Sequence, residues 1–553
     1  MKWLLLITVA MSGALGVSLF LSSETPVPKP VGIVVPHHDM VASARSAYMK
    51  VVGQAVQPKT IVLLSPDHFH SSKIPLTAST KVWETSEGTL APNLELIKEL
   101  GLRVNEADFN REHGVTTILR DIKTFFPDSL LVPIIVHTKA SYSDMESLVG
   151  KLYATCPDCL LISSVDYSHT VQADLAYLHD VYTTRELYQG DAEEIYEGAE
   201  VDSPASLAAL ALWARLHNAP KFDLFSHTNS GYITGRQVGE MTTHIIGGYS
   251  QGEQITIHDD TLTLLFGGDT MFARGVATTH QAMPQDALTG SLGERFFWGV
   301  DAAIVNLEGV FSSKSDYQAG WYEAFPPELR FRPRFIEALT EARITAVSLA
   351  NNHRFDGGEE DYEYTKKLLK KNSITPLANR SGNDPDVLTL TQGKTKVAVM
   401  TITLLGAAED LAPSIRRYQE DGYFVIVYAH FGREEESTAS PDQEAQAKRF
   451  IDAGASLIIG SHPHVVQPVS IYKGVPIVYS LGNLLFDQTE SKEVQVGAVL
   501  GVKIDATGQE LFLVPVSSYL RPEALTKKYP EWTSDWLPFK NGQEGNRYFF
   551  PNN

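Results

Sequence analysis

The chain of 553 residues is longer than one ordinary domain, and its 43% hydrophobic and 20% charged residues are typical of a folded globular protein. It carries 46 basic and 66 acidic side chains, a net charge of −20. This balance argues against a nucleic acid or an anionic lipid surface as the main partner, so we expect no nucleic-acid binding.

The N-terminal segment is strongly apolar. Residues 3–22 contain no charged side chain, so they are long enough to span a bilayer and longer than a typical signal-peptide core. No A-x-A cleavage pattern follows, and the proline-rich residues 24–30 are typical of an extended tether. We expect residues 1–28 to be a single-pass cell-membrane anchor with the remaining chain outside the cytoplasm. A cleaved signal peptide and a secreted protein are the alternative.

Strand and helix patterns alternate over residues 29–250, which predicts an α/β domain there. Helical patterns such as 147–154 and 204–217 separate short runs typical of buried strands. Those runs are 31–36, 60–66, 130–137, 159–166 and 244–250. The only two cysteines, Cys156 and Cys159, precede a strand instead of opening a helix. Their position favours a small disulfide loop over a redox motif.

The alternation begins again after the polar stretch 250–260 and predicts a second α/β domain over residues 258–520. Its strand-like runs are 261–269, 302–309, 344–353, 395–403, 423–432, 456–464 and 476–483. Residues 521–553 are expected to form an irregular tail packed by aromatic side chains.

Side chains that bind metals follow the strand-like runs of the second domain. In open α/β sheets ligands bind beyond the carboxyl ends of strands, so separate strand ends can bring such residues together. Carboxylate, amide and imidazole donors suit one or two ions of the Mn, Fe or Zn type, which can polarise a phosphoryl group and activate water. Loop capping would explain any one of these residues but not all six. They are Asp269, Glu308, Asn352, His430, His462 and His464.

The motifs that contain these residues resemble the CapA family of capsule and poly-γ-glutamate synthesis, within the calcineurin-like metallophosphatase superfamily. The resemblance covers nearly all of residues 258–490 and implies an αββα sandwich with the site at the sheet edge. It implies that the six residues are metal ligands, and that His353 protonates the leaving oxygen or stabilises the transition state. The motifs are GGDTM (267–271), NLEG (306–309), SLANNHRFDGGEE (348–360), HFGREEE (430–436), GSHPHVVQP (460–468) and YSLGNLLF (479–486).

The sequence departs from the wider superfamily at two of these positions. Met271 stands where the phosphatases have a further histidine ligand, so a single metal ion is an alternative to a pair. Glu308 replaces the usual bridging aspartate. Arg330 and Arg332 could clamp an anionic substrate, since guanidinium groups match carboxylates and phosphates, or could be outward charges on a strand. The acidic run that includes Glu434 is typical of solvated surface, although it falls within a family motif.

A second set of histidines and carboxylates gathers at strand ends of the first domain. Three imidazoles with one carboxylate would suit iron, copper or zinc. The set is His37 and His38, His68 and His70, Glu112 and His113, and Asp166 and His169.

The order of these motifs over residues 31–248 resembles the Memo family, which shares the fold of the class III extradiol dioxygenases, the LigB-like proteins. The resemblance implies metal ligation by His37, His68 and His169, with His113 as an acid or base and Asp166 orienting it or a neighbouring ligand. Asp202 stands about where the family has a cysteine and could itself bind the metal, and Thr116 replaces a family glutamate. The resemblance gives no site role to three further histidines, which we expect at the surface or behind the ligands: His38, His70 and His227.

The sequence leaves three functions open. The leading one is a membrane-anchored extracytoplasmic metal-dependent hydrolase that acts on a phosphoester or an amide in an envelope or capsule polymer of the poly-γ-glutamate type. Its substrate would be an anionic polymer or a phosphoester. The alternatives are a non-catalytic metal-binding accessory protein for polymer assembly and a redox metalloenzyme that works through the first domain.

Overall fold

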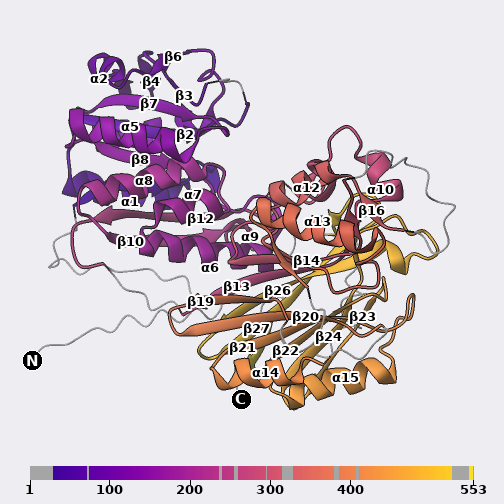
Figure 1. Cartoon of the computed structure of the whole chain (residues 1–553). Helices are drawn as coiled ribbons and strands as arrows, with labels where there is room; N and C mark the ends of the chain where they lie inside the picture. The colour runs from indigo at the N-terminus through magenta and orange to yellow at the C-terminus, as the bar shows by residue number, and fades with distance from the viewer. Residues whose placement is uncertain are drawn as a thin grey trace, which may run out of the picture.

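The computed structural model describes residues 29–70, 74–235, 240–254, 260–293, 295–313, 328–378, 385–405, 410–525 and 547–551. It confirms a mixed α/β protein in two parts, each built on large sheets (Figure 1). The predicted anchor, residues 3–22, lies outside the described residues. Among the helices within the described ranges, none combines the length and the apolar character that a membrane crossing requires.

The first part is built on an eight-stranded sheet in the order β10-β12-β1-β8-β2-β7-β3-β6. Its central strands β1, β8, β2 and β7 run parallel, and apolar side chains pack on both of their faces because helices cover both. The strands are β1 (Pro30–Val35), β2 (Thr60–Pro66), β3 (Leu76–Ala78), β4 (Trp83–Thr85), β5 (Gly88–Leu90), β6 (Arg103–Val104), β7 (Leu130–Val136), β8 (Leu160–Ser164), β9 (Val171–Gln172), β10 (Lys221–Asn229), β11 (Glu240–Met241) and β12 (Thr243–Ser250). The helices are η1 (Asp39–Val41), α1 (Ala42–Ala55), α2 (Leu94–Glu99), α3 (His113–Thr116), α4 (Leu119–Phe125), α5 (Tyr142–Thr155), α6 (Ala173–Gln189), α7 (Ala192–Gly198), α8 (Pro204–Leu216) and α9 (Ser230–Thr234).

The second part contains two larger sheets. One has nine strands, with the path β18-β17-β14-β13-β26-β27-β28 and with β25 and β29 attached, and the other has the order β19-β20-β21-β22-β24-β23. The strands are β13 (Leu262–Thr270), β14 (Ala302–Leu307), β15 (Val310–Phe311), β16 (Arg330–Phe331), β17 (Ala346–Ser348), β18 (Thr375–Leu377), β19 (Val387–Gln392), β20 (Thr395–Thr403), β21 (Phe424–His430), β22 (Leu457–Ser461), β23 (Val466–Tyr472), β24 (Val475–Leu481), β25 (Asn483–Leu485), β26 (Val496–Asp505), β27 (Gly508–Ser517), β28 (Glu523–Ala524) and β29 (Tyr548–Pro551). The helices are α10 (Arg274–Thr279), α11 (Asp286–Thr289), η3 (Pro333–Phe335), α12 (Ile336–Glu341), α13 (Gly358–Lys371), α14 (Ala412–Glu420), α15 (Pro441–Asp452) and η4 (Glu493–Gln495).

The two sheets of the second part pack face to face and carry helices on their outer faces. Phe266 of β13 and Tyr428 of β21 share one apolar core, and the Tyr428 hydroxyl donates to the Gly267 carbonyl over 2.6 Å. Helices α12 and α13 cover the first sheet, and α14 and α15 cover the second (Figure 1). The result is four layers: helices, sheet, sheet and helices.

The parallel strands of both sheets place their carboxyl ends along one edge. Strands β13, β14 and β17 are parallel in the first sheet, and β20, β21, β22 and β24 are parallel in the second. Asp269 and Glu308 therefore lie at ends of the first sheet opposite His430 and His462 at ends of the second. Metal ligands far apart in sequence meet at this edge.

Helix α6 belongs to the core of both parts. Its residues Leu175 and Leu178 join the apolar cluster that contains Leu265 and Val305 of the second part, and α6 contacts β13 and β26. Figure 1 shows α6 at the base of the first part, where it faces β13 and β14. Helix α6 thus packs the two predicted domains against each other.

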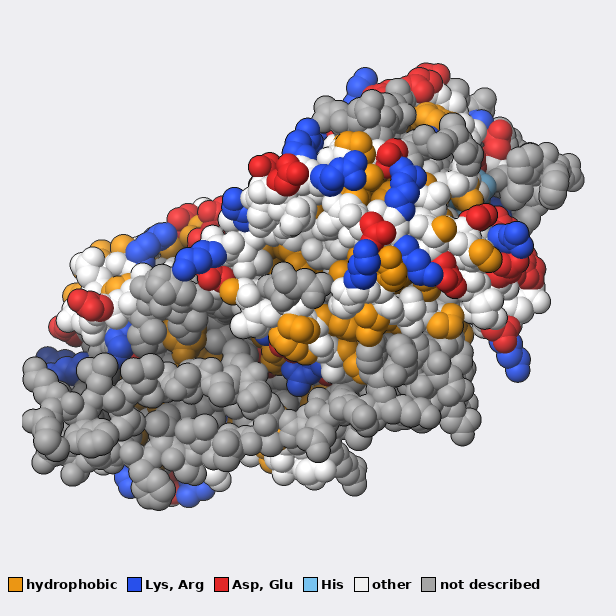
Figure 2. Space-filling view, turned by 90° about the horizontal axis from the view of Figure 1, so that it is seen from below, with side chains coloured by type: hydrophobic (Ala, Val, Ile, Leu, Met, Phe, Trp, Pro, Cys, Tyr) orange, Lys and Arg blue, Asp and Glu red, His pale blue; other side chains and the backbone are white. Residues whose placement is uncertain are grey.

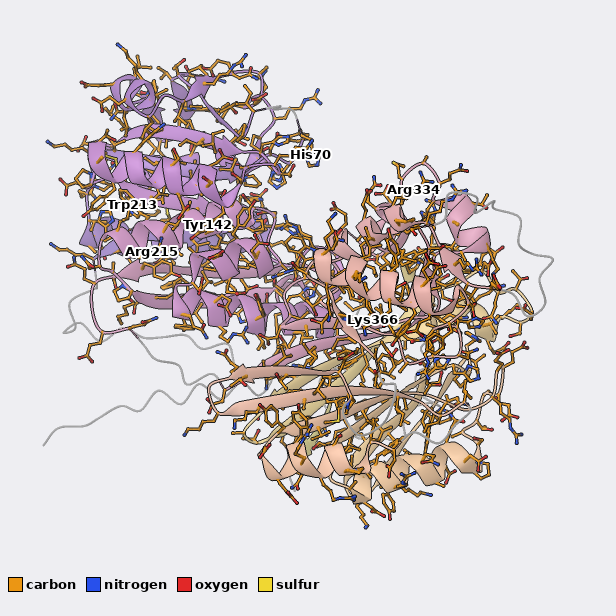
Figure 3. The ribbon with its side chains drawn as sticks, in the orientation of Figure 1. His70, Tyr142, Trp213, Arg215, Arg334 and Lys366 are labelled. Atoms are coloured by element: carbon orange, nitrogen blue, oxygen red, sulfur yellow. A yellow bond between two sulfur atoms is a disulfide. The ribbon has the colours of Figure 1, made fainter. Side chains whose placement is uncertain are left out.

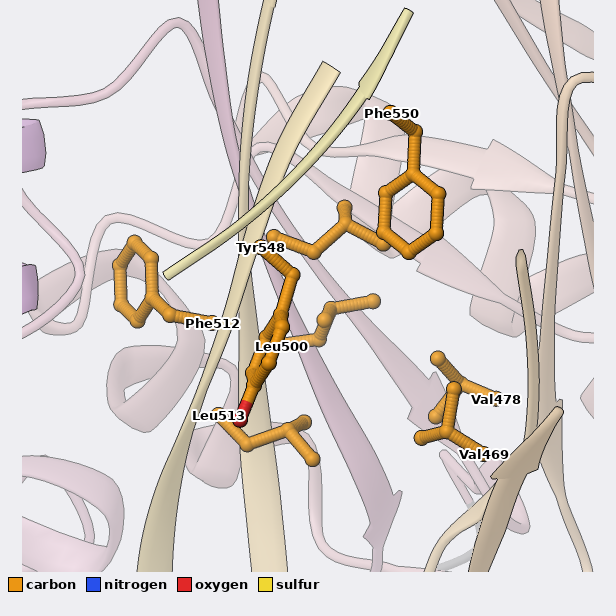
Figure 4. A pocket seen from close by; sticks show the side chains of 8 residues that line it. Val469, Val478, Leu500, Phe512, Leu513, Tyr548 and Phe550 are labelled. Carbon is orange, nitrogen blue, oxygen red and sulfur yellow. The ribbon is translucent and has the colours of Figure 1, made fainter. Parts of the chain in front are cut away.

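Smaller features complete the fold. Cys156 and Cys159 form a disulfide, as predicted. The described ends of the predicted tail, β28 and β29, pair with β27 and extend its sheet. A small pocket next to β29 is lined by apolar side chains such as Leu500, Phe512 and Phe550 (Figure 4). On the face in Figure 2, basic and acidic side chains are intermingled, so neither charge dominates that face.

Candidate metal centres

The six predicted ligands of the second part converge on one place. Ligand atoms of Asp269, Glu308 and His464 lie within 4.8 Å of one another, and so do those of Glu308, His430 and His462. All five of these residues are buried. The side-chain oxygen of Asn352, the sixth predicted ligand, is 2.8 Å from His430 Nε2. Glu308 belongs to both groups, which is the arrangement expected for two ions that share one carboxylate.

The backbone around the two histidines of the GSHPH motif is strained. His462 has a φ of +98° and His464 a φ of +58°, in the left-handed region that side-chain-bearing residues rarely adopt. The backbone N–H of His462 donates to Asp269 Oδ2 over 3.0 Å, which holds this turn against the end of β13. The strained turn aims both imidazoles into the same site.

Hydrogen bonds behind the ligands fix how the imidazoles face the site. His464 Nδ1 donates to the Asn483 side-chain oxygen over 2.9 Å, which leaves Nε2 free for a metal. His430 Nδ1 is 3.0 Å from Ser461 Oγ, so its Nε2 also faces inward. Asn306 donates its amide to Asp269 Oδ1 over 2.7 Å. These partners orient the ligands before any ion binds.

Several ligand atoms in the site have no hydrogen-bond partner among the described residues. Both carboxylate oxygens of Glu308 and Nδ1 of His462 are buried and unpaired. Burial raises the pKa of Asp269, and burial followed by the charge of Asp269 raises the pKa of Glu308 well above its ordinary value. Burial also lowers the pKa of His430 and brings that of His462 to about 3, so both imidazoles are neutral ligands at pH 7. Unpaired buried oxygens beside neutral imidazoles fit a divalent cation.

His353 lies beside the ligand groups, and its imidazole is hydrogen-bonded to a carboxylate. Its Nδ1 donates to Asp356 Oδ2 over 2.8 Å, and its Nε2 is 3.9 Å from Glu308 Oε1. Arg330 donates from Nε and Nη2 to the Asp356 backbone carbonyl, over 3.2 and 3.0 Å, so it supports the loop of His353. Arg332 makes no ion pair with a described residue, and its substrate role stays a prediction.

The position of Met271 provides no ligand. Its side chain is fully buried in the core that includes α6, and its sulfur accepts from the Ala273 backbone N–H over 3.2 Å. Glu434, in contrast, has a carboxylate oxygen within 4.8 Å of ligand atoms of both His462 and His464. Its charge also helps to raise the pKa of Glu308, after burial and Asp269. The acidic run that is typical of surface thus contributes one residue to the site.

A second cluster lies at the strand ends of the first part. Asp202 Oδ2 is 3.2 Å from His37 Nε2 and 3.5 Å from His68 Nε2. Asp166 is 3.3 Å from His37 Nε2 and binds His244 Nδ1 over 3.2 Å, so it orients neighbours other than His113. The structure therefore brings together three of the four ligands predicted here.

The charge state of this cluster differs from that of the second part. Burial alone would lower the pKa of His37, but Asp202 and then Asp166 raise it. Burial would lower the pKa of His68 as well, but Asp202 and Glu112 raise it to about 10. In the metal-free cluster His68 is therefore protonated at pH 7 and pairs with carboxylates, and an incoming cation must displace this proton.

Four further histidines of the first part are placed as follows. His113 groups with His37 and His68 within 4.8 Å, and its ring centroid is 3.9 Å from that of His68. His169 is exposed and belongs to none of the ligand groups found among the described residues, so its ligand role stays a prediction. His70 is also exposed, and His227 pairs with Asp180 over 2.7 Å outside the cluster.

Two protein-family models match the chain, one for each part. Residues 17–242 match the model of the family described as Memo-like protein, and residues 263–488 match that of the bacterial capsule synthesis protein PGA_cap. The chain joins a Memo-like domain to a PGA_cap domain.

Curated relatives match each domain separately. The PGA biosynthesis protein CapA of Bacillus subtilis is 28% identical over 255 residues, which are 42% of this chain and 65% of that protein. The capsule biosynthesis protein CapA of Bacillus anthracis is 33% identical over 257 residues, 42% of this chain and 61% of that protein. The Memo-like domain is similar to a MEMO1 family protein of Nitrosopumilus maritimus, 22% identical over 218 residues, 37% of this chain and 79% of that protein. The chain thus spans less than two thirds of either CapA protein.

Sequence patterns did not single out several residues of the two clusters. In the PGA_cap domain, Arg274 lies beside the site, because its charge acts on Glu308 and it pairs with Asp487. In the Memo-like domain, His244 lies behind Asp166, with its Nδ1 3.2 Å from the Asp166 carboxylate. Glu112, which the sequence did place among the candidates, accepts from His68 Nδ1 over 2.6 Å. Arg274 starts a helix and His244 is the second residue of a strand, so neither stands at a carboxyl end where a ligand would be sought.

Proposed function

We propose that the PGA_cap domain is a metal-dependent hydrolase that acts on a phosphoester or amide bond of an anionic capsule or envelope polymer. We further propose that the N-terminal segment anchors the protein in the cell membrane with both domains outside the cytoplasm. The observation that carries the proposal is the pair of ligand groups that share the buried, unpaired Glu308. The capsule biosynthesis names of the two CapA relatives support the polymer class.

The residues of the site suit hydrolysis. Divalent ions, when bound, supply a Lewis acid and a water of lowered pKa. His353 would donate a proton from Nε2 to the leaving oxygen or nitrogen, because its Nδ1 is tied to Asp356 and its Nε2 faces Glu308. The positive charge of Arg274 beside the acidic ligands favours an anionic group of the substrate.

The variant His353→Gln tests the proposed acid. We expect the full-length protein, reloaded with Mn²⁺, Fe²⁺ or Zn²⁺, to hydrolyse at least one of three probes: bis(p-nitrophenyl) phosphate, p-nitrophenyl phosphate and γ-glutamyl p-nitroanilide. His353→Gln should lower kcat by about 10²–10⁴-fold, because an aligned proton donor is lost. The bound metal, measured by mass spectrometry, should stay unchanged.

His70→Gln is the matched control, because this histidine lies exposed at the edge of the Memo-like domain (Figure 3) and should leave kcat unchanged. Bound metal without turnover of any probe would contradict the hydrolase and favour a non-catalytic accessory protein. A His353→Gln variant with wild-type kcat would remove this histidine from the mechanism.

A second candidate function rests on the Memo-like cluster. His37, His68 and Asp202 form a group of two imidazoles and one carboxylate, which is the donor set of non-haem Fe(II) oxygenases. We propose that the Memo-like domain binds Fe(II) there and supports a redox reaction with oxygen. The pairing of both histidines with Asp202 is the observation that favours this function.

Anaerobic titration with Fe(II) tests the Memo-like cluster. We expect one Fe(II) per chain at this cluster and an affinity lowered at least about 10-fold in Asp202→Ala, because one of three ligands is lost. Asp39→Ala, an exposed aspartate of η1, is the control and should bind Fe(II) normally. Equal Fe(II) affinity in Asp202→Ala, or no oxygen uptake by the Fe(II)-loaded wild type, would rule out the redox function.

A further inference from the structure

The ligand group of Asp269, Glu308 and His464 has one donor fewer than its neighbour. The other group has Glu308, His430 and His462, with the Asn352 oxygen beside them. Met271 cannot complete the first group, because its side chain is enclosed in the apolar core and its sulfur already accepts a backbone hydrogen bond. A metal at this position needs a further protein ligand or is held by three residues only.

The turn after β21 is fastened to the strained GSHPH turn. The Phe431 N–H donates to the Ser461 carbonyl over 3.1 Å, and the Glu435 N–H donates to the Pro463 carbonyl over 2.8 Å. Glu435 itself has a φ of +60°, a left-handed conformation that these contacts maintain. The two turns are therefore joined at two points, and the three residues between these two bonds, 432–434, are held next to the GSHPH turn.

Glu434 is the last of these three residues, and its side chain is directed toward the site. One of its carboxylate oxygens lies within 4.8 Å of ligand atoms of both His462 and His464, one histidine from each ligand group. Glu434 is exposed, whereas the other ligands of this group are buried. Its carboxylate thus approaches the histidines from the solvent side.

We propose that Glu434 is a metal ligand that completes the group of Asp269, Glu308 and His464 in place of the donor that Met271 does not supply. The inference rests on the proposed metal site and goes beyond it by adding a ligand and a metal preference. The completed group has three carboxylates and one imidazole, whereas the neighbouring group is richer in nitrogen. The carboxylate-rich position should therefore prefer Mn²⁺, and the neighbouring position Zn²⁺ or Fe²⁺.

Metal stoichiometry of Glu434→Gln in the full-length protein tests the inference. After equilibrium dialysis against Mn²⁺, we expect two ions per wild-type chain by mass spectrometry, counted in excess of any ion that Glu308→Gln retains at the Memo-like cluster. Glu434→Gln should keep one ion and bind the second at least about 10-fold more weakly, because a charged ligand becomes a neutral amide of the same shape. Glu434→Asp should fall between the two, since it keeps the charge but shortens the reach.

Glu436→Gln is the matched control, because its carboxylate pairs with Arg433 over 3.2 Å and not with the histidines. This control should bind two Mn²⁺ ions, and all variants should show wild-type circular dichroism. Two tightly bound ions in Glu434→Gln would overturn the Glu434 inference while leaving the metal site intact. A wild-type chain that binds no ion would instead contradict the proposed function.

Discussion

Replacing Glu308 with glutamine is expected to empty both metal positions of the PGA_cap domain and to stop hydrolysis. Glu308 is the one residue that belongs to both ligand groups, so its loss affects two ions where other single variants affect one. Since bound ions contribute several kcal/mol of transition-state stabilisation, kcat/KM should fall by at least about 10³-fold. Equilibrium dialysis and the three hydrolysis probes measure the two effects on the same sample.

The same variant should stabilise the metal-free protein. Burial and the charge of Asp269 raise the pKa of Glu308 well above its ordinary value of 4.5, so the folded metal-free chain holds the proton more tightly than the unfolded chain. Stability from this group is therefore present below pH 4.5 and is lost as pH rises toward the folded pKa. Chelated Glu308→Gln should melt above chelated wild type at pH 8, and the difference should shrink toward pH 4.5.

With metal bound, the wild type should instead melt above Glu308→Gln at pH 8. An ion at 100 times its dissociation constant stabilises the fold by about 2.7 kcal/mol, and the variant cannot gain this increment. Glu99→Gln, an exposed glutamate of α2, should match the wild type with and without metal. Equal metal content in Glu308→Gln and wild type would contradict the shared-ligand arrangement.

Most of the PGA_cap site is predictable from sequence, because ligands bind beyond the carboxyl ends of parallel strands. Asp269, Asn352 and His430 each follow a run of buried β residues, and parallel strands bring such ends to one edge of a sheet. Glu434 could not be found in this way, because acidic residues in a row are usually solvated. Only the structure shows that one of them faces the ligands, because the Glu434 carboxylate lies within 4.8 Å of ligand atoms of His462 and His464.

The packing of the two domains is also not readable from the sequence. Helix α6 contains charged and hydroxylic side chains around its whole circumference, which is typical of an exposed helix. In the structure its His179, Asp180 and Arg185 are buried, because partners from both domains surround them. The sequence shows which side chains are polar, but it does not show which of them form ion pairs or hydrogen bonds in the folded protein.

Arg185 makes the most hydrogen bonds of these three buried residues. Replacing it in Arg185→Met is expected to destabilise the whole protein by about 3–5 kcal/mol. The guanidinium is 3% exposed and donates to Glu186, to the Thr261 carbonyl and, through two bonds of 3.0 and 2.7 Å, to Asp301. Methionine fills similar space but leaves Asp301 and Glu186 buried without a cation. Burial already raises the pKa of Glu186 to about 7, so losing its counter-charge should add to the loss.

Urea unfolding of the metal-free full-length protein measures the effect, with Arg120→Met as the control. Arg120 pairs with Glu87 at the surface with 71% of its side chain exposed, so its loss should change the free energy of unfolding by less than about 1 kcal/mol. The variant Arg185→Met/Asp301→Asn should be more stable than the sum of its single changes predicts, because it removes the charge left unpaired. If Arg185→Met unfolds at the same urea concentration as Arg120→Met, this buried arginine does not hold the Memo-like and PGA_cap domains together.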